Sequence, residues 1–264
     1  MNRKNRILLN ELTKTDFKLR YQGSVLGYLW AIIRPLLMFG ILYVVFAKFL
    51  RFGAEIPHYP VYLLIGTVLW NFFTECTNQG IQSLIIRSDL MRKIAFPKWI
   101  IVLSATTTAL INLAINLVVV IVFSLLSGVE LSWTWLIVPF LIFELYLLSF
   151  GIALFLGSLN VKFRDVQSIW EVLIQALFYA IPIIYPLSMV VNYSEVAANV
   201  LMLNPIAQVI QDVRFCLITN ETLTGWAILP NVFLRFVPLL LVAIMFTIGV
   251  LVFKKKSKFF AEEI

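Results

Sequence analysis

Long apolar stretches dominate this chain of 264 residues, and short segments separate them. A helix needs roughly 20 mostly apolar residues to cross the hydrocarbon core of a bilayer. Six stretches of suitable length occupy residues 28–50, 61–84, 101–126, 133–158, 167–189 and 231–253. Charged residues make up only 13% of the chain, against about 25% in a typical soluble domain. The sequence therefore predicts an all-α integral membrane protein in which residues 1–264 form a single transmembrane domain with six transmembrane helices.

Basic residues gather in alternate connections between these stretches. They are Arg3, Lys4, Arg6, Lys14, Lys18, Arg20, Arg87, Arg92, Lys93, Lys98, Lys162, Arg164, Lys254, Lys255, Lys256 and Lys258. The opposite connections offer only Lys48, Arg51 and Arg214. By the positive-inside rule, both termini are predicted to lie in the cytoplasm. Contact with anionic membrane lipid is sufficient to explain the formal net charge of +7, so no nucleic-acid partner is expected.

The sequence lacks the signatures of common catalytic sites. It contains neither the phosphate-binding loop G-x-x-x-x-G-K-[ST] nor the nucleophile motif G-x-S-x-G. His58 is the one histidine, and Cys76 and Cys216 lie far apart in the predicted topology, so neither a metal site nor a disulfide framework is expected. We predict a transport subunit without catalytic residues, metal or cofactor of its own. Any chemical energy that it uses must then come from a separate partner.

Residues 1–27 predict an amphipathic helix at the cytoplasmic membrane surface. Leu8, Leu12 and Leu19 fall at helical spacing on one stripe, which lysines flank. Such a helix can lie in the interface with its apolar stripe in the acyl boundary. Gly23 and Gly27 then permit a sharp bend into the first predicted span. A basic anchor with no further role is the alternative.

Residues 86–98 predict a short surface helix between the second and third spans. Ser88 is a suitable N-cap, Asp89 favours the positive N-terminal end, and Pro97 stops the segment. The side chains suited to a protein groove are the apolar Leu90, Met91, Ile94 and Phe96 and the basic Arg92 and Lys93. A solvated loop is the alternative, but this many apolar residues on a short exposed segment favours a docking surface.

Ionisable residues inside the predicted spans are candidates for function, because each costs a few kcal/mol when unpaired at the membrane centre. Glu75 lies in the middle of the second span, in a polar cluster with Asn71, Thr74, Thr77 and Asn78. We expect Glu75 to be buried at a helix interface or to line a channel. A proton relay is the alternative, and it would need a chain of partners. The weaker candidates are Arg34, Glu144, Glu171 and Arg235.

Three segments carry a resemblance to a known family. The first is Lys-Leu-Arg-Tyr-Gln-Gly-Ser-Val-Leu-Gly-Tyr-Leu-Trp at residues 18–30, followed by Arg-Pro-Leu at 34–36. The others are Leu-Gly-Ser-Leu-Asn-Val-Lys-Phe-Arg-Asp-Val at 156–166 and Asn-Pro-Ile at 204–206. Together with the chain length and span order, they resemble the transmembrane permease subunits of ATP-binding-cassette exporters for O-antigens, teichoic acids, capsules and cell-wall rhamnans. The opening residues 3–24 look most similar to the rhamnan exporters of Gram-positive cocci.

The resemblance implies an assembly and a set of functional residues. Two copies of the permease subunit would enclose a central pore and bind two copies of a separate ATP-binding subunit, which holds ATP and magnesium. Residues 86–98 would be the coupling helix that docks into that subunit, through Asp89, Leu90, Arg92, Lys93, Ile94, Phe96 and Pro97. The interface helix and the following bend would act through Lys18, Arg20, Tyr21, Gly23, Gly27 and Trp30. The cytoplasmic motif before the fifth span comprises Asn160, Phe163, Arg164 and Asp165.

The apolar pattern breaks between Ala180 and Pro230, where Pro182 and Pro186 interrupt it. Proline-broken backbone at membrane depth is tolerated only where protein or water shields it. The resemblance implies that residues 181–230 contain two short re-entrant helices on the outer side, which form an exit gate. An ordinary outer loop with one amphipathic surface helix is the alternative.

Aromatic side chains suit a pore for sugars, because their faces stack against the apolar C–H faces of pyranose rings and still let a glycan slide. In the resembled family, the first and fifth spans line the translocation path. The candidate channel-lining residues are Tyr28, Phe39, Tyr43, Phe46, Glu75, Trp170, Phe178, Tyr179 and Tyr185. Packing against lipid or in an interfacial belt is the alternative for each aromatic residue taken alone.

These features predict the permease subunit of an exporter in a bacterial plasma membrane. Its substrate would be a lipid-linked polysaccharide that moves from the cytoplasmic to the outer face, with an undecaprenyl-type carrier implied by the resemblance. One alternative is an exporter of the same architecture for drugs or lipids, whose pore should be lined by aliphatic residues. A second is a membrane-embedded transferase acting on lipid-linked sugars, which should show clustered carboxylates or a histidine at one membrane face.

Overall fold

The computed structural model describes residues 3–21, 23, 25–51 and 56–260, and every regular element in this part of the chain is helical. The elements are α1 (Arg3–Tyr21), η1 (Gly27–Leu29), α2 (Trp30–Leu42), η2 (Tyr43–Phe49), α3 (Tyr59–Ile86), α4 (Ser88–Lys93), α5 (Trp99–Leu126), η3 (Trp133–Ile137), α6 (Val138–Asn160), α7 (Asp165–Ala180), α8 (Leu187–Tyr193), α9 (Glu195–Met202), α10 (Pro205–Leu217), α11 (Gly225–Ile228), α12 (Val232–Arg235) and α13 (Val237–Lys256). The all-α prediction is confirmed for these residues.

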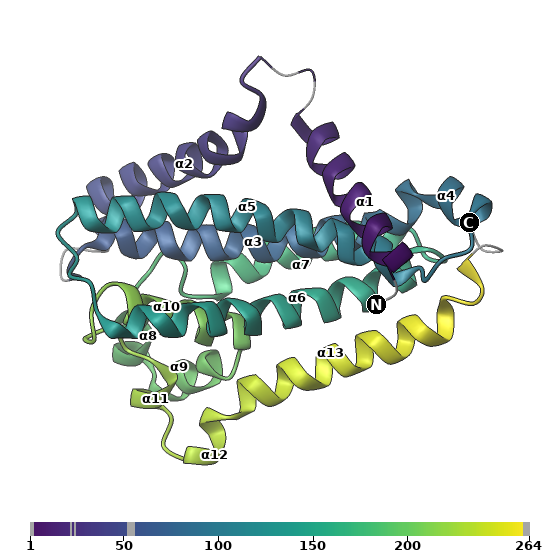
Figure 1. The fold of residues 1–264 in the computed structure, drawn as a ribbon. Coiled ribbons are helices and arrows are strands. Elements are labelled where there is room, and N and C mark those ends of the chain that lie inside the picture. The colour runs from purple at the N-terminus through teal and green to yellow at the C-terminus, as the bar shows by residue number, and fades with distance from the viewer. Residues whose placement is uncertain (1–2, 22, 24, 52–55, 261–264) are drawn as a thin grey trace.

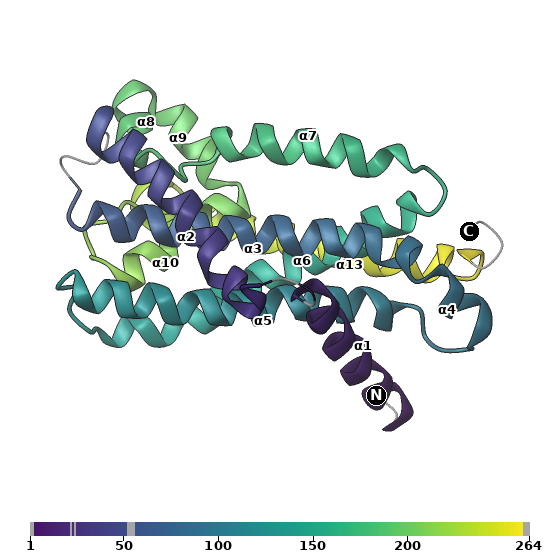
Figure 2. The same ribbon diagram turned by 90° about the horizontal axis from the view of Figure 1, so that it is seen from above.

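Long helices lying side by side form the body of the molecule (Figure 1). α3 packs against α5 and α6, and α6 in turn packs along α13. α7 runs beside α3, as the view from above shows (Figure 2). α1 begins and α13 ends toward the end of the bundle that carries α4, which we call the α4 end. The short helices α8 to α12 lie toward the opposite end, which we call the far end.

Small residues let the long helices approach one another closely. A side chain on Gly249 of α13 would overlap the carbonyl oxygen of Gly151 in α6. A Cβ atom on Gly80 of α3 would likewise overlap that of Ala153 in α6. Lipid tails are as apolar as the side chains of a membrane helix, so moving a side chain from lipid into a helix contact gains little free energy. Close packing therefore supplies much of the attraction between helices. Both contacts involve α6, which thereby joins α3 to α13.

In the described part of the chain, four helical segments are long and apolar enough to cross a membrane: Gly27–Phe49, Trp99–Leu126, Trp133–Asn160 and Val237–Lys256. A fifth span results if α9 and α10, which meet at 94°, together form one broken span. The multi-pass membrane class is therefore supported, whereas the six predicted spans are not confirmed. α3 has the length of a span, with 28 residues, but one of its faces is polar. α7 has only 16 residues, because the proline-broken segment ends it.

An apolar cluster closes the α4 end. Its members come from α3, α4, α5, α6, α13 and the segments after α6 and α13: Leu84, Met91, Ile101, Val102, Ala153, Leu154, Val161, Phe253 and Phe260. Phe260 is fully buried there, and Lys98 Nζ donates a 2.6 Å hydrogen bond to the Ser257 carbonyl oxygen. The segment after α13 thus packs under α4 and the start of α5.

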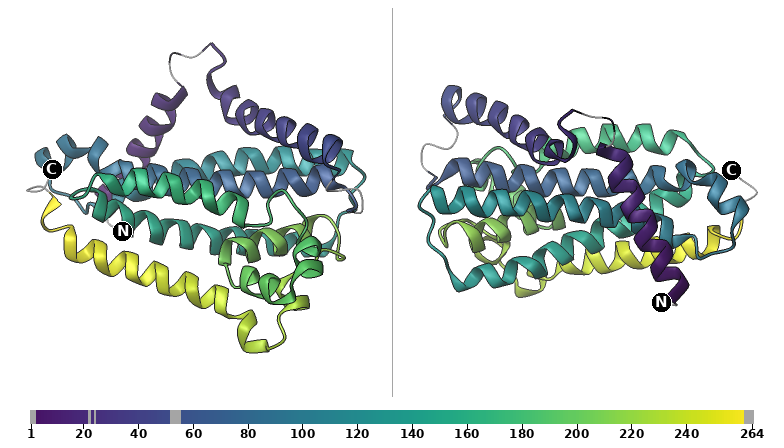
Figure 3. Two further views of the ribbon diagram at one scale, coloured as in Figure 1. Left: turned by 180° about the vertical axis from the view of Figure 1, so that it is seen from behind. Right: turned by 45° about the horizontal axis from the view of Figure 1, so that its top comes forward.

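α1 and α2 pack on one side of the bundle, and both rise from it toward the bend that joins them (Figure 3). α2 and α7 both expose large apolar side chains: Leu37, Met38, Ile41, Ile169, Val172, Leu173 and Tyr179. Apolar surface of this extent on membrane helices faces lipid or another protein. The faces of α2 and α7 are therefore among the apolar surfaces that this chain leaves for its surroundings.

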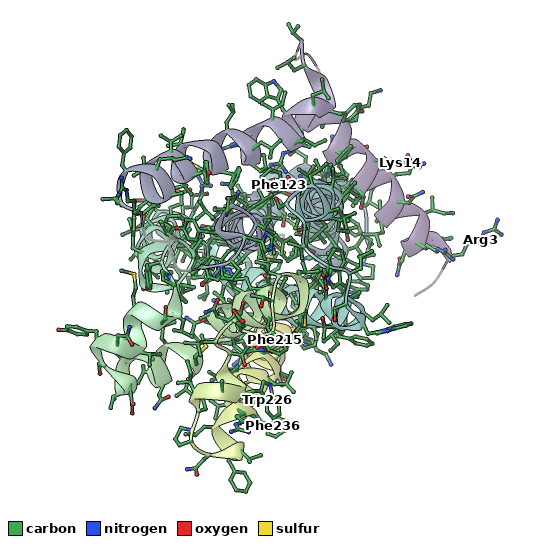
Figure 4. All side chains as sticks on the ribbon, turned by 90° about the vertical axis from the view of Figure 1, so that its left-hand side faces the viewer. Arg3, Lys14, Phe123, Phe215, Trp226 and Phe236 are labelled. Atoms are coloured by element: carbon green, nitrogen blue, oxygen red, sulfur yellow. The ribbon has the colours of Figure 1, made fainter. Side chains whose placement is uncertain are left out.

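The proline-broken segment between α7 and α8 is buried at the far end. Ile181, Ile183 and Ile184 are each at most 3% exposed, which disfavours an ordinary solvated loop. The re-entrant arrangement stays a prediction, since the sharp α9–α10 bend fits either a broken span or a re-entrant loop. Seen from the far end (Figure 4), Trp226 and Phe236 lie together, with ring centroids 5.8 Å apart.

Candidate functional site

A polar groove lies between α2 and α3, with a volume of about 820 Å³. Its polar lining residues are Arg20, Arg34, Asn71, Thr74, Glu75, Asn78, Gln79 and Gln82. Those of α3 recur every three or four residues, which places them on one face of the helix. Trp30, Pro35 and Met38 contribute to the opposite wall. The groove offers amide, guanidinium and aromatic groups to a ligand within a mostly apolar molecule.

Glu75 organises the hydrogen bonds of the groove wall. It forms an ion pair with Arg20 of α1, and the two side chains are 20% and 31% exposed. Asn112 Nδ2 and Gln79 Nε2 donate to Glu75 Oε1 at 2.6 and 3.0 Å. The structure thus places Glu75 both at a helix interface and in the groove. Arg20 balances its negative charge there.

The bend between α1 and α2 leads directly into this groove. Gly23 and Gly27 have positive φ angles of 85° and 49°, a conformation that favours glycine. The predicted bend at these two glycines is therefore confirmed. Phe17 of α1 stacks on Tyr28 beyond the bend, with ring centroids 5.3 Å apart. Trp30 then begins α2 and lines the groove.

α1 packs against α5 rather than lying free. Leu12 and Thr13 are buried, at 7% and 9% exposure, whereas Leu19 on the same predicted stripe is 63% exposed. The apolar stripe is therefore divided between the protein and its surroundings. Lys18 is exposed, and the side chain of Tyr21 lies outside the described part of the chain.

Two of the aromatic residues predicted to line the channel are partly buried against α3. The rings of Trp170 and Phe178 on α7 lie 6.2 Å from Phe73 and 5.9 Å from Trp70, respectively. Trp170 Nε1 also donates to Thr77 Oγ1 at 3.1 Å. These contacts hold α7 against α3, so packing is the role of Trp170 in this structure.

The other predicted channel residues differ in their exposure. Phe39, Tyr43 and Phe46 are partly buried against the main core. Tyr28 and Tyr179 are 57% and 68% exposed. The remaining residue, Tyr185, donates a 2.9 Å hydrogen bond to the Ala180 carbonyl oxygen at the end of α7. Among the predicted channel residues, Tyr28 and Tyr179 are thus the aromatic side chains most exposed to a ligand.

α2 and α7 share a second cavity on α3. It has a volume of about 270 Å³, and Met38 and Leu42 of α2 line it together with Phe178 and Tyr179 of α7. Asn71 lines both this cavity and the polar groove. The segments predicted as spans one and five therefore flank the same side of α3.

α4 occupies the predicted coupling segment, although its cap differs from the prediction. The helix begins at Ser88, the N-cap position is Arg87, and no side chain caps this end by a hydrogen bond. Asp89 lies in the first turn, as predicted, where its charge suits the helix dipole.

The side chains of α4 divide between the bundle and the outside. Met91 is buried, and Phe96 packs against the same α4-end cluster, so both support the segment from beneath. Met91 is therefore unavailable to a partner, contrary to our expectation, whereas Phe96 is only partly buried. Leu90 is partly exposed and Ile94 is 52% exposed. The exposed polar, charged and proline positions of the segment are Asp89, Arg92, Lys93 and Pro97.

The predicted motif before α7 combines a buried and an exposed part. Asn160 is 1% exposed, and its Nδ2 donates to the Ile81 carbonyl oxygen at 3.2 Å. Phe163 is 54% exposed, with Lys162 Nζ 5.6 Å and Lys256 Nζ 6.0 Å from its ring centroid. Arg164 and Asp165 are exposed at the start of α7. Asn160 thus joins α6 to α3, while the three following motif residues face outward.

Of the four weaker ionisable candidates, Arg34 lines the groove and the other three lie elsewhere. Glu171 is exposed and accepts a 2.9 Å hydrogen bond from Gln167 Nε2. The Arg235 guanidinium lies 5.4 Å from the Trp226 ring centroid. Glu144 of α6 faces α10. None of these three lines the polar groove described above.

Arg214 of α10 is a central residue that sequence reasoning missed. It is fully buried and donates to the carbonyl oxygens of Tyr62 at 3.0 Å, Pro182 at 2.7 Å and Ile183 at 2.7 Å. Gln211 Oε1 accepts a fourth hydrogen bond at 2.9 Å. The guanidinium also stacks 3.4 Å from the Tyr62 ring centroid. In the sequence, the signal for this site was a single arginine within the mostly apolar segment between Ala180 and Pro230.

Together, the packed long helices define a multi-pass membrane domain, with the short helix α4 at one end and a polar groove beside α2. Residues 8–218 match the model of the ABC-2 type transporter family. The chain belongs to this family, and the predicted family resemblance is confirmed.

Its relatives include export permeases for surface polysaccharides. The chain is 32% identical over 205 residues to the O-antigen export system permease protein RfbA of Klebsiella pneumoniae, covering 77% of each chain. It is 33% identical over 201 residues to the protein of the same name from Myxococcus xanthus, covering 75% of each chain. It is 22% identical over 214 residues to the polysialic acid transport protein KpsM of Escherichia coli, covering 78% of this chain and 79% of the relative.

Proposed function

We propose that this chain is the permease subunit of an ATP-driven exporter of lipid-linked cell-surface polysaccharide. Membership of the ABC-2 type transporter family supports the transporter class. The O-antigen and polysialic acid relatives support the substrate class. In this proposal, the polymer moves from the cytoplasmic to the outer face of a bacterial plasma membrane.

The polar groove between α2 and α3 is the observation that carries the proposal. An exporter of drugs or lipids should present a mainly aliphatic path. Leu37, Met38 and Ile41 line the α2 side of this groove, but its α3 side carries the amides Asn71, Asn78, Gln79 and Gln82. Amides both donate and accept hydrogen bonds, as sugar hydroxyls do. Arg34 adds a cation suited to a phosphate group of a lipid-linked glycan. The groove therefore matches an amphipathic substrate with a polar head.

The proposed assembly contains two copies of this chain and two copies of an ATP-binding subunit. The α4 end would face the cytoplasm, because the basic residues gather there. α4 would dock into the ATP-binding subunit through Leu90 and Ile94, flanked by Arg92 and Lys93. The exposed faces of α2 and α7 would meet those of the second copy around a pore.

A groove variant tests this function. Replacing Asn78 and Gln82 together by leucine keeps the side-chain volumes similar and removes the hydrogen-bonding groups from the groove. We expect surface polysaccharide per folded permease to fall about tenfold, as after the loss of one to two hydrogen bonds. The ATP-binding subunit should still co-purify. Thr247→Leu on exposed α13 is the matched control.

Three outcomes are informative. Unchanged export in the groove variant would remove the groove from the path. Equal losses in the groove and control variants would indicate a general effect of added leucine. ATP hydrolysis by the purified chain alone would contradict the proposed division of labour.

A further inference from the structure

Two ion pairs connect one face of α1 to other parts of the bundle. Asp16 and Arg20 are four residues apart, so their side chains project from the same side. Asp16 pairs with Arg87, and Arg20 pairs with Glu75. Neighbouring positions of α1 are therefore connected to two separate places, Glu75 within α3 and Arg87 directly after α3.

The first ion pair involves the residue that directly precedes α4 in the coupling segment. Arg87 directly precedes α4 and occupies its N-cap position. Its side chain is 17% exposed and that of Asp16 is 25% exposed, so the pair is largely shielded from solvent. Ser104 Oγ of α5 also donates to Asp16 Oδ2 at 3.3 Å. Asp16 thus joins α1 to the point where α3, α4 and α5 meet.

The second pair reaches the polar groove. Glu75 is twelve residues before Arg87 on the chain, which is about 18 Å along a helix axis. The two partners on α1 are about 6 Å apart along their own axis. Two long arginine side chains, Arg87 just after α3 and Arg20 on α1, bridge the difference. One short stretch of α1 therefore contacts both the coupling segment and the groove wall.

We propose that α1 transmits movement of α4 to the polar groove through these two ion pairs. This inference rests on the proposed docking of an ATP-binding subunit at α4. A displacement of α4 shifts Arg87, which draws Asp16 and the rigid helix with it. Arg20 then moves relative to Glu75 and changes the closure of the groove. ATP binding at one end of the permease thereby alters access to the substrate groove.

The packing of α1 suits this role. Its 19 residues form one uninterrupted helix, and only Leu12 and Thr13 among its described side chains are buried. The main contact of α1 with the bundle is with α5, so the helix can move against α5 as one body. Partly buried ion pairs are less screened by salt than exposed ones. The two pairs are consequently suited to hold α1 in one of two positions.

Charge exchange across the first pair tests the inference in the full chain, purified with its ATP-binding subunit. Spin labels are placed at Lys14→Cys on α1 and Thr247→Cys on α13, and their distance is measured with and without ATP. Wild type should show an ATP-dependent shift. Asp16→Arg and Arg87→Asp should each abolish it and lower surface polysaccharide per ATP hydrolysed by roughly threefold or more. The double exchange should restore both readouts.

The second pair and a surface pair complete the experiment. Arg20→Gln, Glu75→Gln and the double variant should show equal losses, because removing either partner already breaks the same link. Glu11 and Lys14 form an exposed ion pair 3.4 Å apart on the same helix. Their exchange in the unlabelled protein should leave surface polysaccharide per ATP hydrolysed unchanged.

Separate results distinguish failure of the inference from failure of the proposed function. A wild-type chain that retains no ATPase would contradict both. An ATPase complex in which the single exchanges leave the distance shift intact would overturn the inference alone. A lower folded yield with normal export per ATP would reduce the two pairs to stabilising contacts and also overturn it.

Discussion

At the scale of single residues, Arg214 shows how a buried cation can organise a segment that lacks regular structure. The carbonyl oxygens of Pro182 and Ile183 have no helical partner after α7, and the guanidinium supplies donors to both. Arginine suits this role because its donors are arranged in a fixed planar fork. Gly66 completes the site, since a Cβ there would overlap Arg214 Nη2.

Replacing Arg214 by methionine should destabilise the protein by about 3 kcal/mol or more, because buried acceptors lose their donors. Gly66→Ala should act in the same direction by displacing the guanidinium. Thermal unfolding in detergent measures both. Arg235→Met is the control, since the hydrogen bonds of Arg235 to Leu229 are long, at 3.3 and 3.4 Å. Equal melting temperatures of the Arg214 and Arg235 variants would contradict the stabilising role of Arg214.

Substitution by alanine should have different effects on stability and export at two aromatic residues of α7. Trp170 packs on Phe73 and binds Thr77, so Trp170→Ala should cost about 3–5 kcal/mol of stability. Tyr179 is 68% exposed, so Tyr179→Ala should leave the melting temperature within about 2 °C but reduce export. Melting temperature and surface polysaccharide per folded permease are compared. A stable Trp170 variant with poor export would restore Trp170 to the translocation path.

At the scale of elements, α4 has an inner and an outer side. Leu90→Asp with Ile94→Asp should prevent docking, because burying two carboxylates in a partner groove costs several kcal/mol. The chain itself should stay folded. Met91→Asp should instead disrupt the α4-end cluster and lower the folded yield. Co-purification of the ATP-binding subunit and thermal unfolding separate the two effects. Normal co-purification of the first variant would place docking elsewhere.

At the scale of the whole molecule, the apolar faces of α2 and α7 predict an interface with a second copy. Ile41 is 61% exposed on α2, whereas the native Cys76 and Cys216 are buried. Ile41→Cys should therefore form a crosslink between copies on mild oxidation in membranes. Phe140→Cys on α6, where Phe140 is 75% exposed, is the control and should stay monomeric on a gel. The reverse pattern would move the interface to α6.

The local features of the sequence were sufficient to determine the class of protein and several elements. Span length and apolar composition identified the segments of α5, α6 and α13, because these properties belong to consecutive residues. Gly23 and Gly27 indicated the bend for the same reason. The family resemblance, carried by short runs of residues, was confirmed by the match over residues 8–218. α3 was located correctly, yet its polar face could not be assigned to a groove from local pattern alone.

Only the tertiary structure decided how individual side chains are used. Trp170 and Tyr179 lie on one helix, but the first packs on α3 and the second is exposed. Arg20 meets Glu75, and Arg214 meets the Tyr62 carbonyl, across 55 and 152 positions of the chain. Composition and periodicity describe neighbours along the chain, whereas burial and charge pairing depend on which helices pack together. The polar groove, the α1 ion pairs and the Arg214 site therefore exist only once the helices have assembled.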